Sequence, residues 1–311
     1  MPAKPGYDPD MCANACCAAC GADELRAHIK AAGETGAEGL IPSTRQFGSA
    51  LADIARCTRC GHMQLDPMPS EELLAAAYRQ AASEDYIEEE AGQRETARRA
   101  LAQIEARTPT PGALIDLGCW VGFLLAEARE RGWETTGIEP SEFGSTYARD
   151  RLGLNVINDD LFSAELPRAA FDAVTMGDVI EHLTAPGEAL DRIRGLLAPG
   201  GVLWMALPDA GSRVARTMGR RWWSVLPTHV QYFTRRSMAT LLGRHGFEVL
   251  TISTSPKAFT VGYYLERISG YSPALGKALG EAARAAGVAD RMWAPDFRDR
   301  MAVTARLSVS R

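Results

Sequence analysis

Short apolar runs alternate with amphipathic stretches between residues 110 and 210. Ala113–Leu117 is apolar except for Asp116, a pattern typical of a strand buried on both faces. Phe123–Arg131 follows with the spacing of a helix. Repetition of this unit predicts an α/β fold with a Rossmann-like, doubly wound sheet. Further strands are expected at Trp133–Glu139, Phe171–Met176 and Val202–Leu207, and in a segment that ends at Val156–Leu161.

Capping and breaking residues mark the ends of the predicted helices. A helix over Pro186–Leu197 is expected to stop at Ala198–Gly201, where a proline and two glycines form a strong breaker. Nearer the amino terminus, Ser70 can cap a helix that begins at Glu71. Glu88–Arg107 is predicted as a second helix, rich in paired charges and apolar along one face.

The loop after the first strand of the α/β region gives the first indication of chemistry. Gly118 and Gly122 bound this loop, and Asp116 precedes it. Glycines at this point allow a ligand to lie against bare backbone. The G-x-G-x-x-G fingerprint of dinucleotide sites is absent. An acid before the loop suits a ligand with an ammonium group rather than a pyrophosphate, and S-adenosylmethionine (SAM) is such a ligand.

Acidic residues also follow the next strands of the predicted sheet. Glu139 ends the second strand, 21 residues past Gly118, where a carboxylate can accept both ribose hydroxyls. The third strand ends at Asp160, which could read an adenine amino group. The candidate cofactor-binding residues are Asp116, Gly118, Cys119, Trp120, Gly122, Glu139, Pro140, Asp160, Leu161, Gly177 and Asp178.

These motifs occur as an ordered set: D-L-G-C-W-V-G, G-I-E-P, D-D-L, F-D-A-V, D-V-I-E-H-L and L-L-A-P-G-G-V-L-W-M-A-L-P-D. Together they resemble class I SAM-dependent methyltransferases over residues 110–210. The resemblance implies the doubly wound fold, SAM as the cofactor and transfer of its methyl group. Trp120 stands where this family usually has glycine, so the loop must bend around a large ring. A noncatalytic zinc-ribbon adaptor with a degenerate SAM fold is the alternative that this departure raises.

Six of the seven cysteines lie before residue 61, which indicates a metal site in that segment. Two C-x-x-C-G knuckles each turn the backbone so that a pair of thiolates converges. Two such knuckles predict a tetrahedral zinc site, which is structural because four thiolates leave no position for water. A pairing of Cys16 with Cys20 is a looser alternative, and the role of Cys12 stays open. The expected zinc ligands are Cys17, Cys20, Cys57 and Cys60.

Composition shifts along the chain predict its organisation. The amino-terminal part is expected to hold a disordered tail (1–11), a zinc ribbon (12–69) and a helical connector (70–109). The SAM-dependent methyltransferase domain is expected over 110–311, with a basic aromatic lid at 212–246 and a helical insertion at 257–299.

The segment 210–247 contains seven arginines and no acidic residue, although the net charge of the chain is −5. Guanidinium groups grip phosphate and carboxylate groups, so the segment predicts an anionic acceptor. A solvated basic surface is the alternative. Aromatic residues in the same segment suit a lid over the acceptor. The candidate acceptor-binding residues are Arg220, Arg221, Trp222, Trp223 and Tyr232.

Histidine is the natural base for an oxygen or carbon acceptor, which must lose a proton when it is methylated. Of the five histidines, His28 and His62 belong to the predicted ribbon, and His245 stands at a helix end. His229 in the basic aromatic segment is the first candidate for the base, and His182 after the fourth strand is the second. Asp178 could orient either histidine or the SAM ammonium group.

The zinc ribbon, the L-D-P-M-P-S junction and the P-T-H-V-Q-Y-F-T segment resemble zinc-ribbon methyltransferases of sugars and related natural-product precursors. This resemblance implies methyl transfer to an oxygen or carbon of an anionic small molecule, such as a nucleotide-linked sugar. An rRNA or tRNA methyltransferase is the alternative, because some of these enzymes also carry a zinc ribbon. The net charge of −5 disfavours a nucleic-acid partner.

The lengths of the apolar segments indicate where in the cell the protein is expected. No apolar run reaches the length of a membrane span, and the amino terminus has no hydrophobic stretch like that of a secretory signal. We therefore expect a cytoplasmic protein without a membrane partner. The sequence leaves the oligomeric state open.

Overall fold

The computed structural model describes residues 16–33, 47–81, 85–108 and 110–308. The tail predicted at 1–11 and the residue Cys12 lie outside these ranges.

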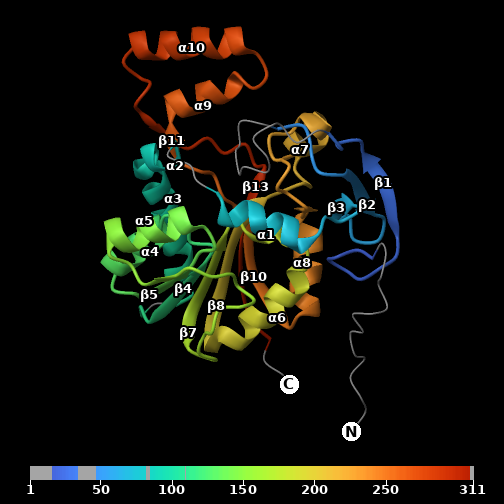
Figure 1. The fold of residues 1–311 in the computed structure, drawn as a ribbon, viewed down its shortest axis with the longest axis vertical. Coiled ribbons are helices and arrows are strands. Elements are labelled where there is room, and N and C mark those ends of the chain that lie inside the picture. Colours follow the sequence, from blue (N-terminus) through green and yellow to red (C-terminus); the bar gives the residue numbers. More distant parts are fainter. Residues whose placement is uncertain (1–15, 34–46, 82–84, 109, 309–311) are drawn as a thin grey trace.

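A seven-stranded sheet forms the centre of the molecule (Figure 1). Its strands are β4 (Ala113–Leu117), β5 (Glu134–Ile138), β6 (Val156–Ile157), β7 (Phe171–Gly177), β8 (Leu197–Pro208), β10 (Phe247–Thr254) and β13 (Arg300–Leu307). They pair in the order β10-β13-β8-β7-β4-β5-β6. The five strands from β6 to β8 in this order run parallel, and β13 runs antiparallel to both of its neighbours. The predicted α/β class and the predicted strands of the SAM region are confirmed.

One predicted boundary is wrong. The breaker at Ala198–Gly201 lies inside β8, because the preceding helix already ends at Leu196. Phe171 pairs with Leu197, and the next pair joins Ala173 to Val202, so four residues of β8 lie opposite a single residue of β7. The proline and glycines thus form an irregularity within the strand, which tolerates them where a regular strand would not.

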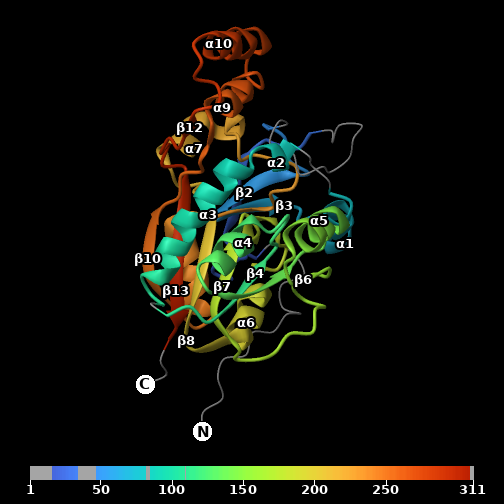
Figure 2. The ribbon, with the colours of Figure 1, turned by 90° about the vertical axis from the view of Figure 1, so that its left-hand side faces the viewer.

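Helices cover both faces of the sheet (Figures 1 and 2). One face carries α3 (Glu90–Glu105), α4 (Phe123–Glu130) and α5 (Glu142–Leu152), and the other carries α6 (Pro186–Leu196) and α8 (Arg235–Arg244). Successive residues of β4 point to opposite faces of the sheet. Leu114 packs with α3 and α4, whereas Ile115 packs in the cluster that contains residues of α6 and α8. This double burial explains why the strand is apolar at successive positions.

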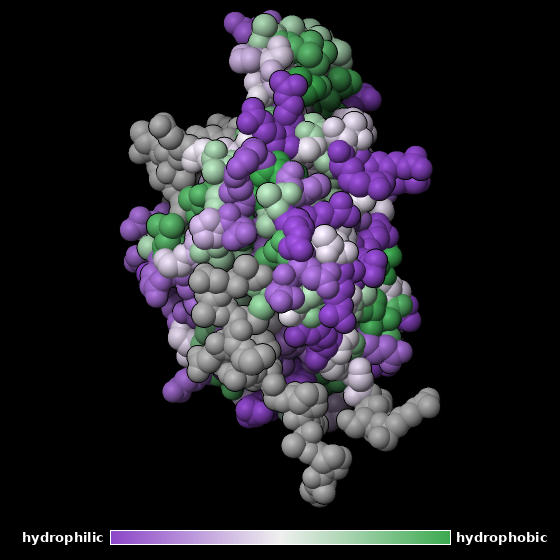
Figure 3. Space-filling view, turned by 90° about the vertical axis from the view of Figure 1, so that its right-hand side faces the viewer, coloured by the Kyte–Doolittle hydropathy of each residue, from purple (hydrophilic) through white to green (hydrophobic). Residues whose placement is uncertain are grey.

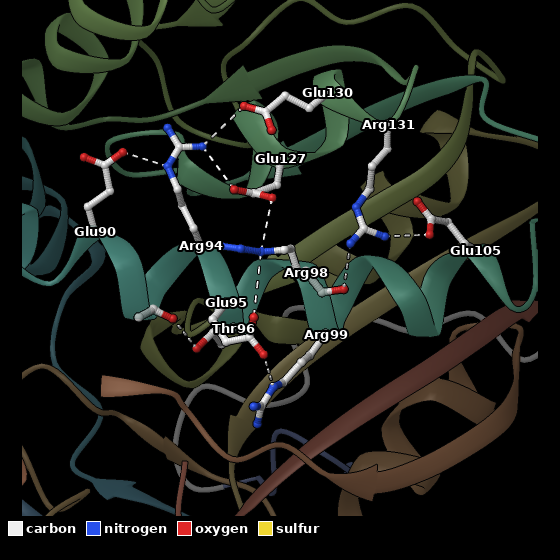
Figure 4. A network of polar contacts seen from close by, with 11 residues as sticks. Glu90, Arg94, Glu95, Thr96, Arg98, Arg99, Glu105, Glu127, Glu130 and Arg131 are labelled. Atoms are coloured by element: carbon white, nitrogen blue, oxygen red, sulfur yellow. Dashed lines mark hydrogen bonds and ion pairs between the residues drawn. The ribbon is translucent and has the colours of Figure 1, made fainter. Parts of the chain in front are cut away.

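The predicted charged helix, α3, is tied to α4 by ion pairs (Figure 4). Arg94 lies 2.7 Å from Glu90 in its own helix and 3.2 Å from Glu127 in α4. Arg131, just after α4, lies 2.8 Å from Glu105 near the end of α3. The paired charges noted in the sequence therefore connect two helices as well as stabilising one.

A second, four-stranded antiparallel sheet contains β1 (Leu25–Ile29), β2 (Asp53–Cys57), β3 (Met63–Asp66) and β9 (Gln231–Tyr232). The fourth strand comes from the later, basic segment of the chain. The chain passes from this sheet through α1 (Glu71–Arg79) and α2 (Asp85–Glu88) to α3. Ser70 caps α1 as predicted, because its hydroxyl accepts a hydrogen bond from the Leu73 amide. The amino-terminal sheet is thus completed by the α/β part of the chain.

Two helices project from the body above the sheet (Figures 1 and 2). They are α9 (Val261–Ile268) and α10 (Pro273–Ala285), and the strand pair β11 (Phe259–Thr260) and β12 (Met292–Trp293) lies at their base. Hydrophobic residues gather at this projecting end (Figure 3). Among the described residues, no helix has both the length and the apolar character that crossing a membrane requires.

Candidate functional site

A cavity of about 2010 Å³ lies along the carboxyl ends of β4, β5 and β7. The strand order reverses at β4, because the chain first adds β5 and β6 on one side and then β7 and β8 on the other. Ligands of open α/β sheets bind at such a reversal. Ten of the eleven residues predicted to bind the cofactor line this cavity, and Gly122 is the exception.

The loop after β4 keeps its expected shape despite its tryptophan. Trp120 adopts φ 50°, in the left-handed region that favours glycine. Its amide donates a 2.7 Å hydrogen bond to Glu139, and its ring lies 5.9 Å from that of Phe143. The departure from the usual glycine therefore changes a side chain of the cavity lining and leaves the loop anchored to β5.

The two glycines of this loop serve different contacts. A Cβ atom on Gly118 would lie 2.6 Å from Val179, which follows β7 at the cavity wall. A Cβ atom on Gly122 would lie 2.5 Å from Leu154, after α5. Gly122 is therefore required for packing around the start of α4, and it has no place in the cavity lining.

Two buried carboxyl groups stand at the strand ends. Asp116 accepts a 2.7 Å hydrogen bond from the Thr175 hydroxyl, and Glu139 accepts bonds from the amides of Trp120 and Ser141. Each residue is only 5% exposed. Burial raises the pKa of Asp116 to about 7 and the pKa of Glu139 to about 7. Both carboxyl groups are thus close to half-ionised at neutral pH before a ligand binds.

Asp160 lies at the far side of the same cavity and is more exposed. Burial acts to raise the pKa of its carboxyl group, but hydrogen bonds from the Ser163 hydroxyl and from the amides of Phe162 and Ser163 lower it below its usual value. This carboxylate is therefore ionised and remains able to accept further hydrogen bonds.

Asp178 lies between two cations that the sequence reasoning missed. Lys257 Nζ lies 2.6 Å from one carboxylate oxygen, and Arg300 Nη2 lies 2.5 Å from the other. Burial acts to raise the pKa of Asp178, but the two positive charges hold it well below its usual range. Lys257 and Arg300 follow Asp178 by 79 and 122 residues, so no local motif joins these three residues. All three line the cavity.

The two histidine candidates are brought together. His182, at the end of η2 (Ile180–His182), and His229 have ring centroids 4.6 Å apart, and both line the cavity. Nδ1 of His182 lies 2.9 Å from the Thr228 carbonyl and contacts the Tyr78 hydroxyl. A carbonyl oxygen only accepts, so Nδ1 carries the hydrogen and Nε2 keeps a lone pair. Burial lowers the pKa of both histidines, so both are neutral at pH 7.

Glu181 lies beside this histidine pair, because one of its carboxylate oxygens lies within 4.8 Å of a ring nitrogen of each histidine. Among the described residues, neither of its carboxylate oxygens has a hydrogen-bond partner. Burial, reinforced by the negative charge of Asp178, raises the pKa of Glu181 to about 8. This carboxyl group is therefore predominantly protonated and uncharged at neutral pH.

The predicted acceptor residues are dispersed by the fold. Arg220 and Arg221, in η3 (Gly219–Arg221) after α7 (Arg213–Met218), are exposed and outside the cavity lining. Trp222 and Tyr232 are buried in the core of the amino-terminal sheet, and only Trp223 lines the cavity. The exposed arginines match the alternative of a solvated basic surface, and the cations whose charges act on the histidine pair are Lys257 and Arg300.

The four predicted zinc ligands converge in one cluster. Cys17 Sγ lies 3.5 Å from Cys60 Sγ, and Cys20 Sγ lies 3.6 Å from Cys57 Sγ. Tetrahedral zinc with bonds of about 2.3 Å would hold its sulfurs roughly 3.8 Å apart. All four are free thiols, and the alternative ligand Cys16 is not part of the cluster. Donor set and spacing thus fit a structural zinc ion.

Comparison with known proteins assigns the central part of the chain. The profile of a family described as a methyltransferase domain matches residues 89–252, more than half of the 311 residues. The chain belongs to this methyltransferase family. Membership of a methyltransferase family disfavours the noncatalytic alternative.

Curated relatives match a shorter part of the methyltransferase. A ubiquinone biosynthesis O-methyltransferase of Caulobacter vibrioides is 33% identical over 120 residues, which cover 35% of this chain and 47% of the relative. An uncharacterized methyltransferase of Mycobacterium bovis is 32% identical over 93 residues, covering 29% of this chain and 47% of the relative. The match spans about half the length of these relatives.

Solved structures agree with the fold. The 1,6-didemethyltoxoflavin-N1-methyltransferase of Burkholderia thailandensis, solved with S-adenosylhomocysteine, has 18% identity and a TM-score of 0.50, covering 81% of this chain and 98% of its own. A chain of the complex between the Haloferax volcanii Trm112 methyltransferase activator and a methyltransferase has 14% identity and a TM-score of 0.51, and the match covers 70% of this chain and 90% of that chain. At these identities the similarity supports the fold alone.

Proposed function

We propose that this SAM-dependent methyltransferase methylates an oxygen or carbon atom of an anionic small molecule, such as a nucleotide-linked sugar or a natural-product precursor. The observation that carries the proposal is a single cavity lined by the strand-end acids, the histidine pair and two half-buried cations. Its volume of about 2010 Å³ exceeds the roughly 300–1,000 Å³ of most small-molecule pockets, which leaves space for an acceptor beside the cofactor.

The half of the cavity at the ends of β4 and β5 would hold the cofactor. Glu139 would accept the ribose hydroxyls, Asp160 the adenine amino group, and Asp116 would balance the ammonium group beside the glycine loop. When bound, SAM supplies a methyl group on a sulfonium, which is a good leaving group. The residues around it contribute mainly by holding acceptor and cofactor in a reactive alignment.

The half of the cavity beside β7 would hold the acceptor. Lys257 and Arg300 together carry two positive charges and Asp178 carries one negative charge, while the nearby Glu181 is mostly protonated at neutral pH. Within this trio one positive charge is therefore in excess in a half-buried setting, where Asp299 also acts on Arg300. A carboxylate or phosphate of the acceptor would neutralise it through charge-assisted hydrogen bonds.

A neutral histidine would remove the proton of the acceptor. His229 is the first candidate and His182, whose Nε2 keeps a lone pair, is the second. Both stay unprotonated at neutral pH because they are buried, which is the state that a general base requires. The names of the curated relatives, ubiquinone biosynthesis O-methyltransferases, support an oxygen acceptor.

We further propose that zinc bound to the four-cysteine cluster is structural. Four thiolates complete the coordination of the ion, so no water ligand remains for catalysis. Three of the cysteines and Met238 of α8 belong to one buried hydrophobic cluster, and Arg244 at the end of α8 donates a hydrogen bond to the Ala19 carbonyl oxygen in the first knuckle. The role of the zinc ion would be to hold the amino-terminal sheet on the methyltransferase domain.

Matched acceptors test the charge requirement. Carboxylic acids and the matching amides are each incubated with the enzyme and methyl-labelled SAM. The acid of a pair should become labelled, and the amide should not. Lys257→Gln should raise the KM of the labelled acceptor with little change in the affinity for S-adenosylhomocysteine, whereas Arg151→Gln, an exposed charge on α5, should change neither. Equal labelling of acids and amides would contradict an anionic acceptor.

A further inference from the structure

The cavity has an aromatic wall that the assignments above do not use. Six of the aromatic residues that line the cavity form this wall, and they come from the segment after α7 and from the base of the projecting helices. They are Trp223, Phe259, Tyr263, Tyr264, Trp293 and Phe297.

The rings of this wall touch in a continuous series. Phe259 and Tyr263 are stacked with centroids 4.1 Å apart. Tyr264 lies 5.5 Å from Trp293 and 6.3 Å from Phe297, both in edge-on contact. Phe297 in turn lies 5.8 Å from Trp223. Strand, helix and loop segments thus present one connected aromatic surface to the cavity.

Part of this surface is exposed without a covering group. Trp293 is 47% exposed and Phe297 is 45% exposed. Tyr271, which also lines the cavity, is 45% exposed. Half of the six exposed large hydrophobic side chains among the described residues therefore lie along this one cavity. Apolar surface concentrated in a concave site indicates a ligand that covers it.

The wall is joined directly to the cation pair. The Tyr264 hydroxyl donates a 2.7 Å hydrogen bond to the Lys257 carbonyl oxygen, and the Lys257 ammonium contacts Asp178. On its other side, the Arg267 guanidinium lies 4.8 Å above the Tyr263 ring and holds it in place. A ligand on the aromatic wall would therefore extend toward Lys257 and the histidine pair.

We infer that the acceptor carries a planar aromatic ring system, which stacks against Trp293 and Phe297 while its anionic group reaches Lys257 and Arg300. This inference rests on the proposed function and deepens it by naming the class of acceptor. Aromatic side chains recognise flat rings through offset-stacked and edge-on contacts. An aromatic acid, a phenol with an acidic substituent or a nucleotide base linked to its phosphates has the required shape and charge.

Anilinonaphthalene sulfonate, a fluorescent aromatic anion, serves as the probe. The full-length protein, saturated with S-adenosylhomocysteine so that the cofactor half is filled, is titrated with it. We expect saturable binding, and the Trp293→Ala/Phe297→Ala double variant should raise the dissociation constant about tenfold or more. Leu73→Ala and Leu275→Ala, equally exposed apolar residues outside the cavity lining, should leave it unchanged. Naphthalene sulfonate should displace the probe and octane sulfonate should not.

Two readouts separate this inference from the proposed function. S-adenosylhomocysteine affinity, measured by calorimetry in the same samples, reports on the cofactor half alone and should be equal in all variants. Equal displacement by octane sulfonate, or a double variant that binds the probe as the wild type does, would overturn the aromatic subsite. Absence of S-adenosylhomocysteine binding with intact probe binding would instead speak against the proposed function. Circular dichroism excludes unfolding of the variants as the cause.

Discussion

Acidification should weaken the binding of S-adenosylhomocysteine, because the two strand-end carboxyl groups must be ionised to hold it. Burial raises the pKa of Glu139 and that of Asp116 to about 7 in the free protein. Below this pH the free protein holds a proton on each group, and that proton must leave before the carboxylate can accept hydroxyl donors or face an ammonium group. Affinity should therefore rise with pH through about 7 and level off above it.

The size of the effect follows from the two pKa values. A group with a pKa of about 7 is mostly ionised at about pH 7.5, and about 3% ionised at about pH 5.5. The dissociation constant should thus increase about 25-fold over this interval for each carboxylate that must ionise, which corresponds to roughly 1.9 kcal/mol. If Glu139 and Asp116 both contribute, the increase approaches the product of the two factors.

Calorimetric titration at several pH values measures this dependence directly. The amides of Trp120 and Ser141 donate to different oxygens of Glu139, so Glu139→Gln keeps an acceptor for one of them only. It also cannot ionise, so its binding should be weaker at about pH 7.5 and should vary less with pH. Circular dichroism at each pH checks that the fold persists. A wild-type dissociation constant that stays the same from about pH 7.5 to about pH 5.5 would refute the role assigned to these acids.

Three further predictions address the remaining parts of the account. Metal analysis should find about one zinc per chain, and Cys57→Ser should lose metal and solubility together; disulfides among the four thiols would contradict this. His229→Ala should lower kcat, leave the S-adenosylhomocysteine affinity unchanged and remove the acidic limb of the pH–rate profile, whereas full turnover in this variant with loss in His182→Ala would move the base to His182. Glu181→Gln should melt several degrees higher than the wild type at about pH 9. The pKa of Glu181 is raised in the folded protein, so the wild type loses stability as the pH rises from about 4.5 through about 8. Equal melting temperatures at about pH 9 would show that Glu181 is not held in an apolar setting.

Features set by neighbouring residues could be predicted from the sequence. The Ala113–Leu117 strand is recognisable because both of its faces are buried, and this burial makes successive positions apolar. The cysteine knuckles are recognisable because a zinc site imposes a short, fixed spacing on each pair of ligands. The breaker at Ala198–Gly201 misled, because a bulge in a long strand uses the same residues as a loop.

The acceptor half of the site could not be predicted, because it depends on contacts between distant segments. Lys257 follows β10 and Arg300 begins β13, so both reach Asp178 only through the last strands of the sheet. Nothing in the residues next to either cation marks it as part of a site. Conversely, the seven arginines of 210–247 make this segment basic, but none of them lines the cavity, since composition does not specify the direction in which a side chain points.

A crystal structure of the complex with S-adenosylhomocysteine tests the central claim most directly. We expect one molecule per chain in the cavity at the ends of β4 and β5, with its ribose hydroxyls on Glu139 and its sulfur facing the half lined by His229 and Lys257. S-adenosylhomocysteine bound elsewhere, or with its sulfur turned away from the histidine pair, would contradict the account.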